Sequence, residues 1–177
     1  MYKRQIDEHK WGLGIFLDFP KAFDSLDHSI LLNKLKHYGI TGTPLSWFES
    51  YLSNRTNYVH FNGVNSQTMT PTHGVPQGSN LGPLLFLIYI NDLYLISTTL
   101  FFILFADDSN PLMFDSCIDS LFNNMNIELE KVFDWLIANK LSLNYDKSEF
   151  ILFHTYQRAK FIPTDTCLLY TSPSPRD

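Results

Sequence analysis

The stretch LFFILFADDSNPLMF, residues 100–114, decides the fold. Two apolar runs, 100–105 and 112–114, flank six residues rich in Asp, Ser, Asn and Pro, which is the composition of a turn. This pattern predicts a β-hairpin whose tip carries two adjacent acids, Asp107 and Asp108.

Two neighbouring carboxylates at such a place are costly, because they repel each other and the apolar flanks penalise their ionisation. A divalent cation removes both penalties, and Mg²⁺ prefers oxygen ligands. Asp18 follows the apolar run 12–17, which predicts a buried strand, and supplies a third acid. Three clustered carboxylates suit two metal ions about 4 Å apart, the arrangement used in phosphoryl transfer. By themselves, Asp107 and Asp108 fit an ordinary solvated turn equally well.

The rest of the chain predicts helices and strands in a mixed order. We expect helices over 30–38, 46–52, 84–95 and 118–139, strands over 58–62 and 150–153, and a loop over 72–82. Asp27 or Ser29 caps the first helix, and Asn62-Gly63 favours a hairpin turn. Helix 84–95 is apolar nearly all round, and helix 118–139 is expected to hold Glu128 and Lys131 on its outer side. The order predicts an α+β fold with helices on one face of an antiparallel sheet.

Composition limits the classes of protein. The 177 residues, 45% hydrophobic and 15% aromatic, fit one folded domain, placed at 6–155, with an unpatterned tail at 156–177 that is a linker or non-native. The net charge of −5 argues against a wide grip on phosphate backbones, yet a metal site needs carboxylates. Asn91 and Asp92 interrupt the most apolar stretch, 84–105, so no membrane span is expected.

Neither cysteine indicates a disulfide or a metal site. Cys117 and Cys167 lack metal-ligand spacing, and no signal peptide opens the chain, so buried or free thiols in a reducing compartment are expected. The histidines form no close cluster in sequence, which disfavours zinc. We therefore expect an intracellular location, in cytoplasm and nucleus.

Three segments together resemble a known family. GIFLDFPKAFD (14–24), GVPQGSNLGP (74–83) and FADD (105–108) resemble, in order and spacing, motifs A, B and C of reverse transcriptases. The resemblance is nearest to non-LTR (LINE-type, jockey-like) retrotransposons and covers roughly residues 12–155. It extends to WFESYLSNR (47–55), YINDL (89–93) and WLIANKLSLN (135–144).

The resemblance implies a polymerase palm and roles for individual residues. Asp18, Asp107 and Asp108 would bind two Mg²⁺ ions, with Mn²⁺ as a substitute, and the carbonyl of Phe19 would assist. The remaining implied roles belong to Phe23 beneath the incoming sugar, Gln77 and Gly78 beside the nascent base pair, and Lys147 as proton donor to pyrophosphate. Packing beside Phe16 and Phe19 is the alternative for Phe23, and a solvated surface charge the alternative for Lys147. Lys21 and Arg55 fit contacts with triphosphate or template, or solvated charges.

The implied activity is RNA-directed DNA polymerisation in retrotransposition, with an RNA template, a DNA primer and dNTPs as partners and no membrane. We expect fingers and thumb to be largely missing here, along with the element's other domains. A truncated relic that at most binds metal or nucleic acid is the alternative, and an RNA-directed RNA polymerase fits the motifs less well. Pro20 departs from the small polar residue usual after motif A's acid and removes an amide donor there.

Overall fold

The computed structural model describes residues 10–53, 55–106, 108–156, 158 and 172–173. The chain divides into two compact units. We call Met1–Pro20 with Asp92–Asp177 the sheet unit, and Lys21–Asn91 the helical unit. Both boundaries between the units, after Pro20 and after Asn91, fall inside the single domain predicted over 6–155. The outer boundaries of that domain stay a prediction.

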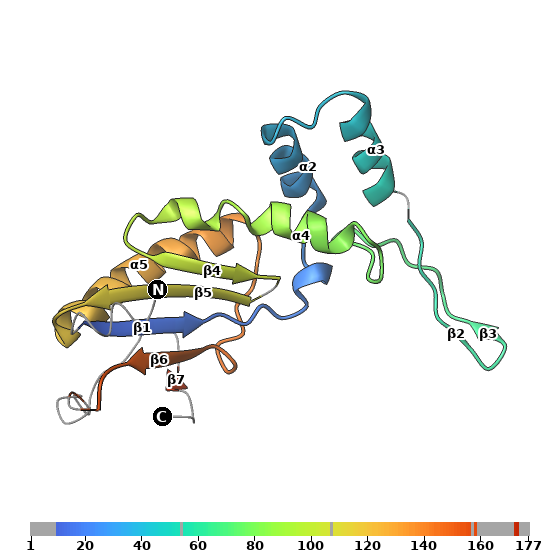
Figure 1. The fold of residues 1–177 in the computed structure, drawn as a ribbon. Coiled ribbons are helices and arrows are strands. Elements are labelled where there is room, and N and C mark those ends of the chain that lie inside the picture. Colours follow the sequence, from blue (N-terminus) through green and yellow to red (C-terminus); the bar gives the residue numbers. More distant parts are fainter. Residues whose placement is uncertain (1–9, 54, 107, 157, 159–171, 174–177) are drawn as a thin grey trace. The chain divides into compact units, whose positions relative to one another are not determined.

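The sheet unit is built on a five-stranded sheet with the order β4-β5-β1-β6-β7 (Figure 1). Its strands are β1 (Trp11–Phe16), β4 (Phe101–Phe105), β5 (Asp108–Asp115), β6 (Glu149–Phe153) and β7 (Ser172–Pro173). All neighbours pair antiparallel except β6 and β7, which are parallel. β7 falls in the segment that the sequence left without a pattern, and the rest of 159–177 lies outside the described residues.

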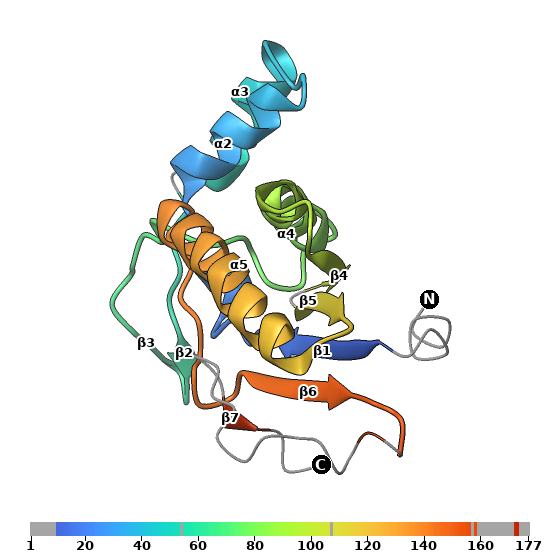
Figure 2. The same cartoon turned by 90° about the vertical axis from the view of Figure 1, so that its left-hand side faces the viewer.

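One face of this sheet is covered by α5 (Ile118–Ala138), as Figure 2 shows. Successive side chains of a strand point to opposite faces. On β1 the buried side chains of Leu13 and Ile15 share a face with Phe150 of β6, since Ile15 pairs with Phe150. The Phe150 ring lies edge-on to Phe122 of α5, with 6.1 Å between centroids. The odd-numbered residues of β1 therefore face α5 and form the core.

The helical unit contains η1 (Ala22–Asp24), α2 (His28–His37), α3 (Thr43–Leu52) and α4 (Gly82–Ile90), with a short hairpin of β2 (His60–Phe61) and β3 (Val64–Asn65). Asp27, not Ser29, caps α2, because its Oδ1 accepts hydrogen bonds from the backbone N–H groups of Ser29 and Ile30. The predicted Asn62-Gly63 turn is confirmed, with positive φ at both residues (48° and 77°).

Two predicted elements differ from the structure. The helix expected over 84–95 ends at Ile90 and is followed by the 3₁₀-helix η2 (Leu93–Ile96). It is not buried all round, since Leu84 and Leu87 are 50% and 45% exposed. The six-residue turn expected at 106–111 is also wrong, because β5 already begins at Asp108. Pairing with Ile103 and Phe102 of β4 extends that strand through Asn110 and Pro111 despite their turn preference. In the described part of the chain, every helix is too short or too polar to cross a membrane.

Glu128 of α5 was expected on the outer side of its helix, and it is buried. The 3.6-residue period of a helix shows which residues share a side of it. The period cannot show that a polar loop, here the one with Ser97 and Thr99, covers the side that carries Glu128. Here the Glu128 Oε1 accepts a hydrogen bond from Lys131 Nζ at 2.7 Å. Burial by itself raises the pKa of Glu128, but the hydrogen bond from Lys131 and the nearby hydroxyls of Ser97 and Thr99 outweigh it and hold the pKa below its ordinary value of 4.5.

The sheet unit's stability should therefore depend on the charge of Glu128. Because the folded-state pKa lies below the unfolded value of 4.5, this stabilisation is complete above pH 4.5 and is lost as pH falls through the folded pKa. We expect Glu128→Gln to lower the free energy of unfolding by about 1 kcal/mol at pH 7 and the difference to shrink in acid. Urea unfolding across pH checks this, with the exposed Glu130→Gln as control. A difference that grows below pH 4.5 contradicts it.

Candidate functional site

Asp18 and Asp108 lie opposite each other in the sheet unit, where β1 ends and β5 begins. The β1–β5 register pairs Gly14 with Leu112 and continues unchanged to the bridge between Leu17 and Ser109, where Leu17 N donates to Ser109 O at 3.2 Å. One residue further, the same register sets Asp18 opposite Asp108. By the alternation of the strands, both belong to the face away from α5. Asp108 is exposed and Asp18 half-buried, so the sheet face that carries these two acids is open to solvent at this end of the strands.

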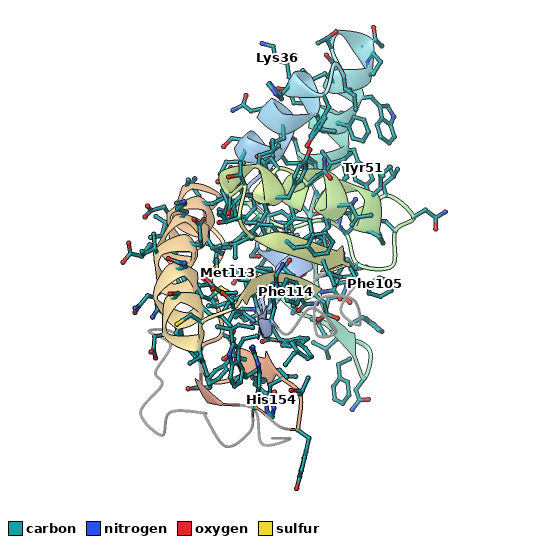
Figure 3. All side chains as sticks on the ribbon, turned by 60° about the vertical axis from the view of Figure 1, so that its left-hand side comes forward. Lys36, Tyr51, Phe105, Met113, Phe114 and His154 are labelled. Carbon is teal, nitrogen blue, oxygen red and sulfur yellow. The ribbon has the colours of Figure 1, made fainter. Side chains whose placement is uncertain are left out.

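The β4–β5 hairpin ends beside these acids. Phe105 pairs with Asp108, so only Ala106 and Asp107 connect the strands. Ala106 has a φ of +52°, a conformation uncommon for a residue with a Cβ, and Phe105 is 75% exposed at the end of β4 (Figure 3). Asp107 lies outside the described residues. The tight turn shows that Asp108 is the first residue of a strand rather than part of a loop.

Hydrogen bonds fix the backbone of Asp18 to segment 144–148. Asn144 N donates to Asp18 O at 2.9 Å, and Asp18 N donates to Ser148 Oγ at 3.3 Å. Ser148 is fully buried and its hydroxyl donates to Asn144 O at 2.7 Å. Lys147 is exposed within this segment, so the structure brings the predicted proton donor's segment next to Asp18. The role of Ser148 was missed, because nothing in the sequence shows which hydroxyl reaches a strand 130 residues away.

Phe19 directly follows Asp18, and its side chain is only 6% exposed. The ring is thus part of the core, and the backbone carbonyl is the group left for the predicted ligand role.

The other predicted residues come together in the helical unit. Val75 N donates to Phe23 O at 2.8 Å, and Gln77 Nε2 donates to Asp24 Oδ1 at 2.9 Å. The loop of Gln77 and Gly78 is therefore tied to the segment that carries Phe23. The Phe23 ring packs on Phe86 of α4, with 5.0 Å between centroids. Phe23 therefore does pack against another ring, which was the alternative to a role beneath the sugar. The partner is Phe86 rather than Phe16 or Phe19.

The loop over 72–82 depends on a glycine that sequence reasoning did not single out. Gly74 has a φ of +82°, and a Cβ there would lie 2.7 Å from the Cα and 2.8 Å from the carbonyl O of Asp24. Its N–H donates to Leu26 O at 2.8 Å. The signal was present in GVPQG, where a glycine precedes a proline-containing loop.

The family profile described as reverse transcriptase (RNA-dependent DNA polymerase) matches residues 3–170. The chain belongs to the reverse transcriptase family. It is 28% identical over 159 residues to the probable RNA-directed DNA polymerase of transposon X-element from Drosophila melanogaster, covering 86% of this chain and 17% of that protein. It is 35% identical over 88 residues to the polymerase of the mobile element jockey from the same fly, covering 50% and 10%. The resemblance to non-LTR retrotransposons is confirmed.

The fold of this reverse transcriptase chain is also found in solved structures. Telomerase from Candida tropicalis, in complex with a fragment of telomeric RNA, superposes with a TM-score of 0.64 at 14% identity, covering 88% of this chain and 28% of that one. Telomerase from Candida albicans gives a TM-score of 0.60 at 14% identity, covering 82% and 27%. These likenesses confirm the predicted α+β palm fold.

Enzymes of this family generally depend on a divalent metal. The acids present fit that requirement, because carboxylate oxygens are hard ligands and Asp18 and Asp108 share one solvent-open face. Among the described residues alone, which exclude Asp107, no group of three or more metal-binding side chains occurs.

Proposed function

We propose that this chain is the catalytic palm of an RNA-directed DNA polymerase in a non-LTR retrotransposon, which adds dNTPs to a primer 3′-OH. The register that sets Asp18 opposite Asp108 carries the proposal. Two carboxylates facing each other across neighbouring strands repel, and a folded protein tolerates such a pair where cations offset the repulsion. The chain spans 17% of the X-element polymerase, so the activity of the whole protein is proposed here and not observed.

In this proposal Asp18, Asp107 and Asp108 hold two Mg²⁺ ions, which Mn²⁺ can replace. Bound ions would supply a lowered pKa at the attacking hydroxyl and charge stabilisation of the leaving pyrophosphate. The hydrogen bonds from Asn144 and to Ser148 hold the Asp18 backbone in place, and the Phe19 carbonyl adds a ligand oxygen. Lys147, on the same segment, delivers a proton to pyrophosphate.

The helical unit would select and position the nucleotide. Phe23, held against Phe86, lies beneath the sugar and excludes a ribose 2′-OH by contact. Gln77 and Gly78 lie beside the nascent base pair, where the absence of a Cβ at Gly78 permits close approach. The partners are an RNA template, a DNA primer and dNTPs, together with the longer protein's fingers and thumb.

Primer extension on an RNA template with Mg²⁺ and dNTPs tests the proposal. The 177-residue chain is assayed alone and after replacing the corresponding segment of a jockey polymerase. Extension by the chimaera but not by the isolated chain is expected. A chimaera that folds but does not extend would favour the relic, and incorporation of rNTPs in preference to dNTPs would favour an RNA polymerase.

A further inference from the structure

We propose that the sheet unit carries a binding site for an arginine side chain, in which Asp115 and Glu128 hold the guanidinium. Apolar side chains of the same cavity pack on the aliphatic stem of that arginine. The arginine would come from a protein segment beyond this chain, which covers 17% of the X-element polymerase. The site lies at the opposite end of β5 from Asp108, and binding there depends on neither a metal nor polymerase activity.

A cavity of about 440 Å³ is lined by residues of α5 and by the end of β5. At this end β5 runs past its neighbour β4. Phe101 is the first residue of β4 and pairs with Leu112, so Met113, Phe114 and Asp115 lie beyond the last β4 partner. Figure 3 shows Met113 and Phe114 beside α5. The volume falls within the range of about 300–1,000 Å³ that is typical of ligand pockets.

Two carboxylates line this cavity, those of Asp115 and Glu128. Asp115 pairs with Trp11, and the odd-numbered residues of β1 face α5, so Asp115 lies on the same side of the sheet as Glu128. Among the described residues, no Lys, Arg or His belongs to the lining. Lys131 pairs with Glu128 Oε1 at 2.7 Å and balances one of the two negative charges. The cavity therefore keeps one unbalanced negative charge, which attracts a cation.

Both carboxylates have an oxygen left for a ligand. Glu128 is 8% exposed, and its buried Oε2 has no hydrogen-bond partner among the described residues, although the hydroxyls of Ser97 and Thr99 lie nearby. Asp115 uses Oδ1 to accept a hydrogen bond from Cys117 N at 3.0 Å. Buried acceptors in folded proteins nearly always have a partner. A guanidinium has five N–H donors in a planar fork, so one such group can bond to both carboxylates.

Apolar side chains form the rest of the wall that a ligand would touch. Met113 and Phe114 belong to the lining, as does Ile127 of α5, which is 56% exposed. Ile127 shares a side of α5 with Asn124 and Glu128, because helix positions three and four apart lie together. Arginine packs its methylene groups on such apolar surface while its charged head reaches a polar partner. A metal ion makes no use of an apolar wall, so the lining favours a cation on an aliphatic stem.

An NMR titration of the isotope-labelled 177-residue chain tests the site. EDTA is present and dNTP is absent, so a failure here is distinguishable from a failure of the proposed polymerase function. The probes are Nα-acetyl-arginine amide and Nα-acetyl-citrulline amide, which has the same length without the charge, at matched ionic strength. We expect a Kd on the order of millimolar for the arginine probe. The citrulline probe should bind at least about ten-fold more weakly.

Variants of the lining assign the binding to this cavity. Asp115→Asn should weaken binding of the arginine probe about ten-fold, because Asn still accepts from Cys117 N but has no charge. Glu128→Gln should weaken it to a similar degree. Ile127→Ser should weaken binding about three-fold through lost apolar area. Asp134→Asn is the matched control, since it removes one charge from an exposed residue of α5 outside the lining, and it should bind as the parent chain does.

Equal binding of the two probes, or no saturable binding by about 100 mM, overturns the proposal. Unchanged binding in the folded Asp115→Asn variant also overturns it. If Asp115→Asn does not fold, Ile127→Ser decides in its place, because Ile127 is largely exposed and its replacement leaves the core intact. Putrescine binding more tightly than the arginine probe would assign the cavity to a free amine and overturn the assignment to a protein side chain.

Discussion

Replacing Asp108 by Asn in the jockey chimaera should reduce primer extension by about 1,000-fold or more, since loss of charge stabilisation of several kcal/mol corresponds to that factor. Asn keeps the size of the side chain but removes the negative charge that a metal ligand supplies. Asp108 is exposed, so the free energy of unfolding should stay unchanged. Asp18→Asn and Asp107→Asn should reduce primer extension to a similar degree. Single-nucleotide incorporation rates and urea unfolding measure both quantities.

Asp134→Asn provides the control for this change of charge. Asp134 is exposed on α5, the helix that covers the opposite face of the sheet, and this variant should extend primers normally. If Asp108→Asn extended primers as well as Asp134→Asn, the site would be assigned to the wrong acids. If Asp108→Asn instead unfolded the sheet unit, its role would be structural.

Replacing Gly74 by Ala should destabilise the helical unit by about 3 kcal/mol, the sum of a left-handed conformation and a steric clash. The φ of +82° strains any residue with a Cβ, and the added atom would lie 2.7–2.9 Å from the Cα, C and O of Asp24. All three are backbone atoms and none is a flexible side-chain end, so the backbone must move. Urea unfolding of the 177-residue chain measures the effect. Extension by the chimaera should fall with it, because the same loop carries Gln77.

Gly78→Ala separates the two causes. Gly78 has a similar φ of +78°, but a Cβ there meets nothing within 4 Å. Gly78→Ala should therefore lower the free energy of unfolding only through the strained left-handed conformation, by about 1 kcal/mol. If Gly74→Ala and Gly78→Ala lowered the free energy of unfolding equally, the close contact with Asp24 would contribute nothing to the effect.

Local pattern was enough for most elements. The alternation and apolar runs gave β1 and β6, the helical period gave α2, α3 and α5, and Asn62-Gly63 gave the hairpin turn, because each signal lies within a few residues. The motifs around Asp18, Gln77 and Asp108 likewise identified the family from sequence alone. Local pattern failed at Asn110 and Pro111, where pairing with β4 outweighed turn preference.

By itself, then, the sequence determined the order of elements, the palm fold and the acids to test, since periodicity and motif spacing are properties of neighbouring residues. Only the tertiary structure decided that Asp18 faces Asp108, that Ser148 holds the Asp18 backbone, that Glu128 is buried, and that Arg55 stacks on Tyr51. Strand register and side-chain contacts join residues far apart in the chain or on separate turns. Their energies depend on the packing of whole elements, which no short window of sequence contains.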